Sequence, residues 1–108
     1  MGAEIKRHIN IPRIASIETA IRIHDENLYL GTKEIKTLFP GIGNARVSTL
    51  KKAANECTRE HGRIPYSAYD VLAEDAYIAW HRDIKELKKK HDEILRLEKK
   101  IAAVRGAV

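Results

Sequence analysis

The hydrophobic positions between residues 28 and 65 recur every three or four residues, and this period predicts two short helices joined by a tight turn. We expect Thr32 to cap the first helix with its hydroxyl. The apolar residues of this helix fall on one face: Ile35, Leu38 and Phe39. Pro40 and Gly41 should end it, because proline has no amide hydrogen to donate and glycine accepts left-handed backbone angles.

The second predicted helix follows a Gly-Ile-Gly turn and is capped by Asn44. Its apolar face has spacings of three, four and three residues: Val47, Leu50, Ala54 and Cys57. The opposite face is basic and rich in hydrogen-bonding groups, and Gly62 should form a left-handed stop at the end. A short helix held at an angle to another, with such residues near its N-terminus, is typical of a helix-turn-helix that enters a DNA major groove.

The C-terminal third contains no proline or glycine between residues 74 and 105, and it predicts one continuous helix about 48 Å long. Tyr77 and Trp80 should pack on the core. Further along, the apolar positions follow a heptad-like seam. The residues of this seam are Ile84, Leu87, His91, Ile94, Leu97 and Ile101. We expect it to join two copies as a homodimer, parallel or antiparallel; the alternative is a helix that folds back on its own domain.

Weaker patterns fill the remainder of the chain. Residues 12–25 favour a helix beginning at Pro12, with a strand over residues 19–24 as the alternative. Residues 28–30 favour a short extended segment, and Ser67 with Asp70 is similar to a capping box that starts a short helix. The expected fold class is all-α, or mainly α with a very short β element. We divide it into a helix-turn-helix domain (1–73) and a long C-terminal helix (74–108).

The distribution of charged residues along the chain supports the interpretation of residues 28–65 as a DNA-binding helix-turn-helix. The net charge is +5, and residues 31–65 hold seven Lys/Arg against three Asp/Glu, or +4. A cationic helix-turn-helix is expected of a phosphate-facing surface, although such faces are often only solvated. No apolar run is long enough to span a membrane, and no secretory signal precedes the helices, so a cytoplasmic location is expected.

The stretch TKEIKTLFPGIGNARVSTL, with Gly62-Arg63-Ile64-Pro65 after it, resembles the helix-turn-helix of the excisionase and MerR-like group over residues 28–65. Pro40 is an extra residue in the turn, Gly43 replaces the usual serine, and no clear wing hairpin follows Pro65. The resemblance implies a small transcriptional regulator or recombination directionality factor of a phage or mobile element. An alternative is a phage-encoded anti-defence inhibitor that uses this scaffold to bind a protein partner.

The candidate DNA-contacting residues follow from the polar face of the second helix and the lysines of the first. The expected base contacts are Asn44, Arg46, Ser48 and Thr49, since arginine can bind guanine and asparagine can bind adenine through two hydrogen bonds. The expected phosphate contacts are Lys33, Lys36, Lys51, Lys52 and Arg59.

Other chemistry has little support in the sequence. No nucleophile elbow, Walker loop or dinucleotide motif occurs, so neither an enzyme nor a cofactor is expected. The five histidines show no ligand spacing with each other or with carboxylates, so no metal site is predicted. The acidic residues Asp70, Glu74 and Asp75 suit the start of a helix. The single cysteine, Cys57, excludes an internal disulfide and is interpreted as an inert core residue.

Overall fold

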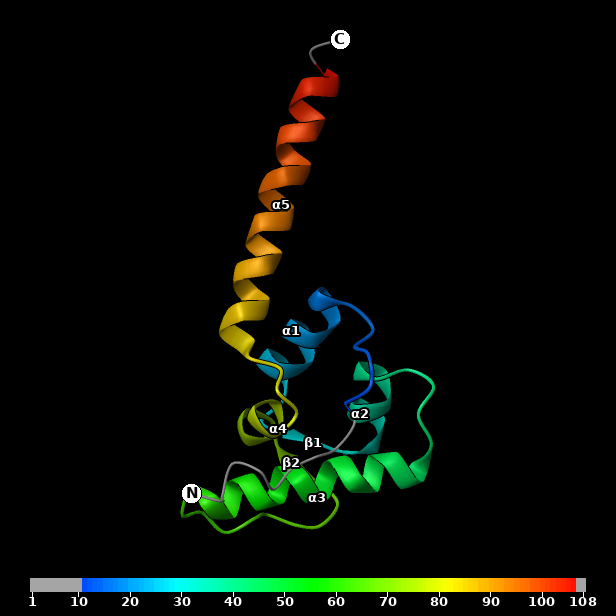
Figure 1. Ribbon diagram of the computed structural model, residues 1–108, viewed down its shortest axis with the longest axis vertical. Helices are drawn as coiled ribbons and strands as arrows, with labels where there is room; N and C mark the ends of the chain where they lie inside the picture. The colour runs from blue at the N-terminus through cyan, green and yellow to red at the C-terminus, as the bar shows by residue number, and fades with distance from the viewer. Residues whose placement is uncertain (1–10, 107–108) are drawn as a thin grey trace.

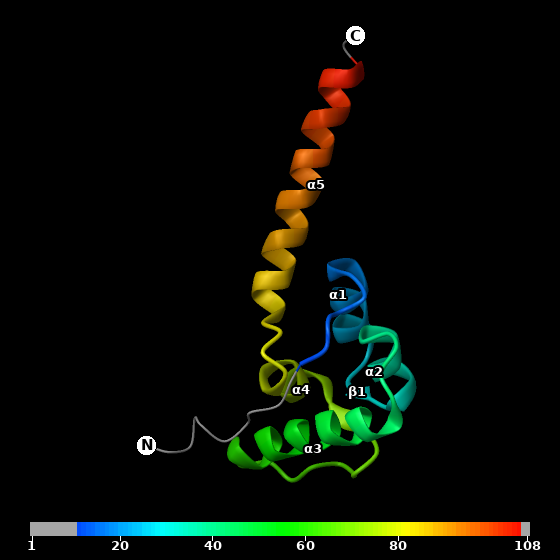
Figure 2. The same ribbon diagram turned by 45° about the vertical axis from the view of Figure 1, so that its right-hand side comes forward.

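The computed structural model describes residues 11–106, so residues 1–10 and 107–108 of the two predicted domains lie outside the description. The elements in order are α1 (Ile17–Glu26), β1 (Tyr29–Leu30), α2 (Thr32–Leu38), α3 (Asn44–Glu60), β2 (Val71–Leu72), α4 (Ala73–Ala79) and α5 (Ile84–Gly106). The predicted mainly α fold with a very short β element is confirmed. Figures 1 and 2 show α3 lying across one end of the molecule, while α5 extends away from the opposite side of the core.

The first helix begins later than predicted. Its cap is Ser16, which has an extended backbone and whose Oγ accepts a hydrogen bond from the Thr19 amide at 3.0 Å. The preceding segment, with Pro12, is irregular, and the Ala15 amide donates to the Leu38 carbonyl at 2.8 Å. This contact holds the chain against α2, and the prediction of a helix starting at Pro12 is therefore wrong.

The caps of α2 and α3 are glycines, which corrects the predicted caps. Gly31 and Gly43 occupy the extended cap positions, so Thr32 and Asn44 are the first helical residues. The Gly31 amide donates to Glu34 Oε1 at 2.9 Å, which satisfies one amide at the start of α2. The two helices end as expected: Gly41 after α2 and Gly62 after α3 have positive φ angles of 85° and 77°.

Residues 67–72 form a turn and a strand where the sequence favoured a helix start. Ser67 Oγ accepts hydrogen bonds from the Tyr69 and Asp70 amides, which closes a turn that does not propagate. The chain then enters β2, whose residues pair antiparallel with β1 as Tyr29↔Leu72 and Leu30↔Val71. Val71 is fully buried in the core, which explains why this segment forms a strand and not the start of a helix.

Helix α4 completes the core, as expected for Tyr77 and Trp80. The fully buried Trp80 indole donates to the Leu50 carbonyl at 2.9 Å and meets the Phe39 ring edge-on at 5.5 Å. The Tyr77 hydroxyl donates to the Ala20 carbonyl at 2.6 Å, and burial raises the pKa of this hydroxyl. The predicted domain boundary after residue 73 therefore passes through α4, inside the hydrophobic core.

The predicted continuous C-terminal helix is broken between α4 and α5. His81 has a positive φ of 55°, and the Arg82 guanidinium donates to the Pro12 carbonyl at 3.1 Å. Asp83 Oδ1 accepts from the Lys85 amide at 2.9 Å and so caps α5. The chain turns between α4 and α5 without any glycine or proline. The turn is fixed by the burial of Trp80 in the core before it and by the Asp83 cap after it.

The first turns of α5 pack on the protein's own core, which corrects part of the predicted dimer seam. Leu87 is buried and Ile84 packs against the core cluster, while His91 is half-buried. Lys88 Nζ lies 3.1 Å from Asp25 Oδ2 and ties α5 to α1. The rest of the seam stays exposed: Ile94, Leu97 and Ile101, together with Val104.

Candidate nucleic-acid interface

Helices α2 and α3 form the predicted helix-turn-helix pair, with the predicted apolar face of α3 turned inward. That face is at most 3% exposed: Val47, Leu50, Ala54 and Cys57. The two helices are also joined by a polar contact, in which Lys51 Nζ donates to Thr32 Oγ1 at 2.8 Å. The buried face and this polar contact therefore fix the position of α3 relative to α2.

A cavity of about 580 Å³ runs along this other side, and we call it the α3 groove. Its lining is Thr32 of α2, Asn44, Val47, Ser48, Lys51, Lys52, Asn55, Glu56 and Arg59 of α3, and Ala68 and Tyr69 of the loop 61–70. Three of these side chains are cationic and only Glu56 is acidic, which leaves a net charge of +2. Such a groove attracts anions.

The loop 61–70 forms the outer wall of the α3 groove. It runs back along the C-terminal part of α3, as Figures 1 and 2 show. Asn55 Nδ2 donates to the Ser67 carbonyl at 2.9 Å, and the Tyr66 ring lies 4.8 Å from the Tyr29 ring. The residues of the first turns, such as Asn44 and Ser48, remain exposed. The part of α3 open to a large partner is consequently its N-terminal half.

A buried carboxylate fixes the start of this loop. Asp75 of α4 is fully buried and accepts hydrogen bonds from Thr58 Oγ1, His61 Nδ1 and Arg63 Nη2, each at 2.8 Å. Burial acts to raise the pKa of the Asp75 carboxyl, but the three hydrogen bonds outweigh it and hold the pKa below its usual range. Asp75 thus holds both the end of α3 and the first residues of the loop.

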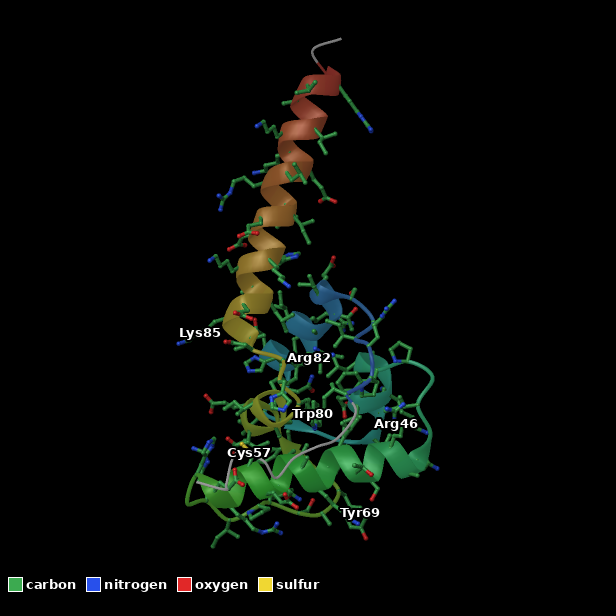
Figure 3. All side chains as sticks on the ribbon, in the orientation of Figure 1. Arg46, Cys57, Tyr69, Trp80, Arg82 and Lys85 are labelled. Carbon is green, nitrogen blue, oxygen red and sulfur yellow. The ribbon has the colours of Figure 1, made fainter. Side chains whose placement is uncertain are left out.

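The four predicted base-contacting residues do not share one face. Asn44 and Ser48 line the α3 groove, while Arg46 and Thr49 do not. Arg46 lies two residues before Ser48, a rotation of about 200° around a helix, and Figure 3 shows Arg46 and Tyr69 on opposite sides of α3. The Thr49 hydroxyl donates to the Ala45 carbonyl at 3.1 Å. Arg46 therefore cannot contact the same base edges as Ser48.

The predicted phosphate-contacting residues are also divided. Lys52 and Arg59 are exposed and line the α3 groove. Lys51 lines it too, but it is only 9% exposed and is hydrogen-bonded to Thr32, so it is a buried cation and not a flexible surface lysine. Lys33 and Lys36 are exposed on α2 outside the lining. Lys36 follows Thr32 by four residues and shares its side of α2.

Asn55 and Tyr69 line the groove but were not among the predicted DNA contacts. Asn55 lies eleven residues after Asn44, about three helical turns, and the helical period did place it on the polar face of this helix. Its Oδ1 atom is buried without a hydrogen-bond partner among residues 11–106. The sequence around Tyr69 did not indicate that this residue lies beside α3, because the path of the loop 61–70 depends on the pairing of β2 with β1.

A second cluster lies at the C-terminal end of α3, where His61 approaches a carboxylate and a thiol although the sequence showed no histidine and carboxylate at ligand spacing. Cys57 Sγ is 3.9 Å from His61 Nε2, and His61 Nδ1 is 2.8 Å from Asp75 Oδ1. One candidate ligand atom from each of the three residues lies within 4.8 Å of the others. Cys57 is buried, as expected. The four-residue spacing of Cys57 and His61, about one helical turn, was the sequence signal that could have predicted this cluster.

No helix within residues 11–106 has both the length and the apolar character needed to cross a membrane. No family model, no curated protein and no solved structure matches the chain. The functional argument therefore depends on the geometry of the site.

Proposed function

We propose that this protein binds double-stranded DNA through the N-terminal half of α3. The observation that carries the proposal is the α3 groove, in which a helix-turn-helix presents Asn44 and Ser48 beside Lys51, Lys52 and Arg59. Asparagine and serine side chains can hydrogen-bond base edges in the major groove. The N-terminal residues of a recognition helix are the ones that contact bases in this class of motif.

In this proposal the cations provide most of the affinity. Lys52 and Arg59 are exposed and can neutralise phosphates, as can Lys36 on the adjoining side of α2. Lys51 differs because its ammonium group is already held by Thr32, so it loses little conformational freedom on binding. We assign Arg46 to a backbone phosphate and no longer to a base, because it lies outside the groove.

We also propose that two copies associate through the distal part of α5. Its exposed apolar residues are spaced by three, four and three positions: Ile94, Leu97, Ile101 and Val104. Their exposed fractions are 42–63%. This spacing is that of alternating a and d positions in a coiled coil. A second copy presents a stripe of the same shape, so a twofold pair buries both stripes together.

The flanking charges favour an antiparallel pair. With Ile94 at an a position, Glu93 and Lys100 occupy g positions, and Glu98 and Arg105 occupy e positions. An antiparallel pair brings g beside g and e beside e, which gives Glu93 with Lys100 and Glu98 with Arg105. A parallel pair brings g beside e, which gives Glu93 with Glu98 and Lys100 with Arg105, and like charges repel.

Selection from a random duplex library, followed by binding measurements at two salt concentrations, tests DNA binding. A selected consensus sequence and an affinity that falls steeply with salt are expected, because each neutralised phosphate adds about 0.9 to the slope of log K against log salt. Binding without a consensus would contradict sequence-specific recognition. Absence of salt-dependent binding would favour the protein-partner alternative.

A further inference from the structure

The cluster of Cys57, His61 and Asp75 has no role in the proposed DNA interface. It lies at the C-terminal end of α3, where Cys57 and His61 are separated by one helical turn. Figure 3 shows Cys57 on the side of α3 that faces α4. The His61 side chain is 40% exposed, so the cluster has a path to solvent, while Cys57 is 1% exposed.

The hydrogen bond between His61 and Asp75 decides which ring nitrogen is available. The Asp75 carboxylate also accepts from Arg63 and Thr58, and these bonds favour its ionised form. An ionised carboxylate can only accept, so the proton of a neutral imidazole lies on Nδ1. The lone pair of Nε2 then faces Cys57 Sγ, 3.9 Å away.

We propose that Cys57 Sγ and His61 Nε2 bind a zinc-class divalent metal ion, with Asp75 orienting His61 from the other side of the ring. Zinc bonds of about 2.3 Å to sulfur and about 2.05 Å to nitrogen, at a tetrahedral angle, place the two ligand atoms about 3.6 Å apart. The observed separation of 3.9 Å between Cys57 Sγ and His61 Nε2 needs to shorten by about 0.3 Å. In such sites the ligand histidine usually donates a hydrogen bond from its other ring N–H to a carboxylate, a backbone carbonyl or water.

Binding converts the Cys57 thiol to a thiolate. The sulfur–metal bond forms as the sulfur–hydrogen bond breaks, and the proton leaves to solvent, while the nitrogen–metal bond uses the existing lone pair of His61. Two protein ligands leave the remaining coordination positions to water on the exposed side of His61. The inference goes beyond DNA binding and does not depend on it.

Titration of the reduced, chelator-treated protein with Co²⁺, followed by displacement with Zn²⁺, tests the site. We expect one Co²⁺ per chain with a thiolate-to-cobalt absorption band in the near ultraviolet, which Zn²⁺ removes. Cys57→Ala should abolish the band. His61→Gln should raise the Kd at least about tenfold, and Asp75→Asn about 10–100-fold, the range known for outer carboxylates of metal sites.

The matched control is His91→Gln, which removes a half-buried histidine far along the chain and should leave Co²⁺ binding unchanged. Circular dichroism establishes that each variant is folded. The His61 side chain is 40% exposed, and glutamine at this position keeps an amide that can donate a hydrogen bond to Asp75. The proposal would be overturned if the parent protein showed no thiolate band at millimolar Co²⁺. It would also be overturned if the band persisted in Cys57→Ala, or if the Kd for Co²⁺ were unchanged in His61→Gln.

Discussion

Lys51 of α3 donates a hydrogen bond to Thr32 of α2 across 2.8 Å, and this contact joins the two helices of the helix-turn-helix at the edge of the α3 groove. A lysine that is 9% exposed carries its charge in a fixed position. The same side chain therefore connects the fold of the motif with the electrostatics of the proposed DNA-binding surface.

Replacing Lys51 with methionine should weaken binding to all duplex sequences alike and lower the salt slope by about one unit, because one phosphate contact is lost. Methionine keeps an apolar stem of similar length, so the fold should survive. Lys85→Met is the matched control, since Lys85 lies at the base of α5, away from α3, in Figure 3. Equal salt slopes in the two variants, measured by fluorescence anisotropy, would exclude Lys51 from the interface.

Asn44 and Arg46 are only two residues apart, yet they should behave differently. Asn44→Ala should cost about 1–3 kcal/mol on the selected site and relax the preference at one base pair, as expected for loss of a base contact. Arg46→Ala should lower affinity for all sequences without altering preference. Repeating the library selection with each variant distinguishes them. A relaxed preference in Arg46→Ala alone would reverse this assignment.

Asp75→Asn should destabilise the protein by about 1–3 kcal/mol, because the hydrogen bonds from Thr58, His61 and Arg63 lose their charged acceptor. Urea denaturation of the metal-free protein measures this difference. Glu74→Gln changes the exposed neighbouring carboxylate and should stay within about 0.5 kcal/mol of the parent. Similar midpoints for both variants would show that Asp75 does not anchor the loop 61–70.

The contact between Asp25 and Lys88 predicts a pH dependence. Hydrogen bonds from His24 and then Lys88 lower the pKa of Asp25 from 3.8. A lowered pKa contributes stability above the unfolded pKa, and this contribution is lost as the pH falls through the folded value. Lys88→Gln should flatten the loss of stability between about pH 5 and pH 3, by less than about 1 kcal/mol since the pair is partly exposed. Lys89→Gln is the matched control, since the neighbouring Lys89 is exposed, and this variant should keep the pH dependence of the parent. An unchanged profile would contradict docking of α5 on α1.

Leu97→Asp should give a monomer in sedimentation equilibrium, because it places an unpaired charge in the proposed apolar seam of α5. Ile78→Asp is the matched control: Ile78 is 51% exposed on α4, outside that seam. A parent protein that is monomeric at tens of micromolar would contradict the dimer.

The orientation of the pair needs a separate variant. Exchanging the charges of Glu98 and Lys100 (E98K with K100E) keeps the net charge, makes every g–e pair attractive and makes every g–g and e–e pair repulsive. A cysteine introduced at position 90, the d position before Ile94, should resist intermolecular disulfide formation in the parent background, where its two copies lie about 27 Å apart along an antiparallel pair. It should cross-link readily in the exchanged background. Cross-linking in the parent background would establish the parallel arrangement.

The sequence predicted the elements that depend on local periodicity and failed where distant segments meet. The apolar faces of α2 and α3 and the glycine stops after them were correct, because spacing and left-handed angles are local properties. The break before α5 was missed, although Asp83 and Glu86 form a recognisable capping pattern.

The composition of the groove was predictable only in part for the same reason. Asn44, Ser48 and Lys52 belong to one helix face and follow from its period, whereas Tyr69 reaches the groove through the loop 61–70. The burial of Lys51 requires Thr32 nineteen residues earlier. Asp75 meets Cys57 and His61 only after β2 pairs with β1 and brings α4 onto α3.

The position of α3, across the end of the molecule opposite the free end of α5, determines what a dimer can hold. If Ile94 of one copy lies opposite Val104 of the other, the two Leu87 positions are about 36 Å apart along the pair. The two α3 helices then lie beyond those positions, farther apart than one turn of duplex DNA. Under the proposed DNA binding, such a dimer would tether two separate DNA segments, and the expected effect is a loop in the DNA between them.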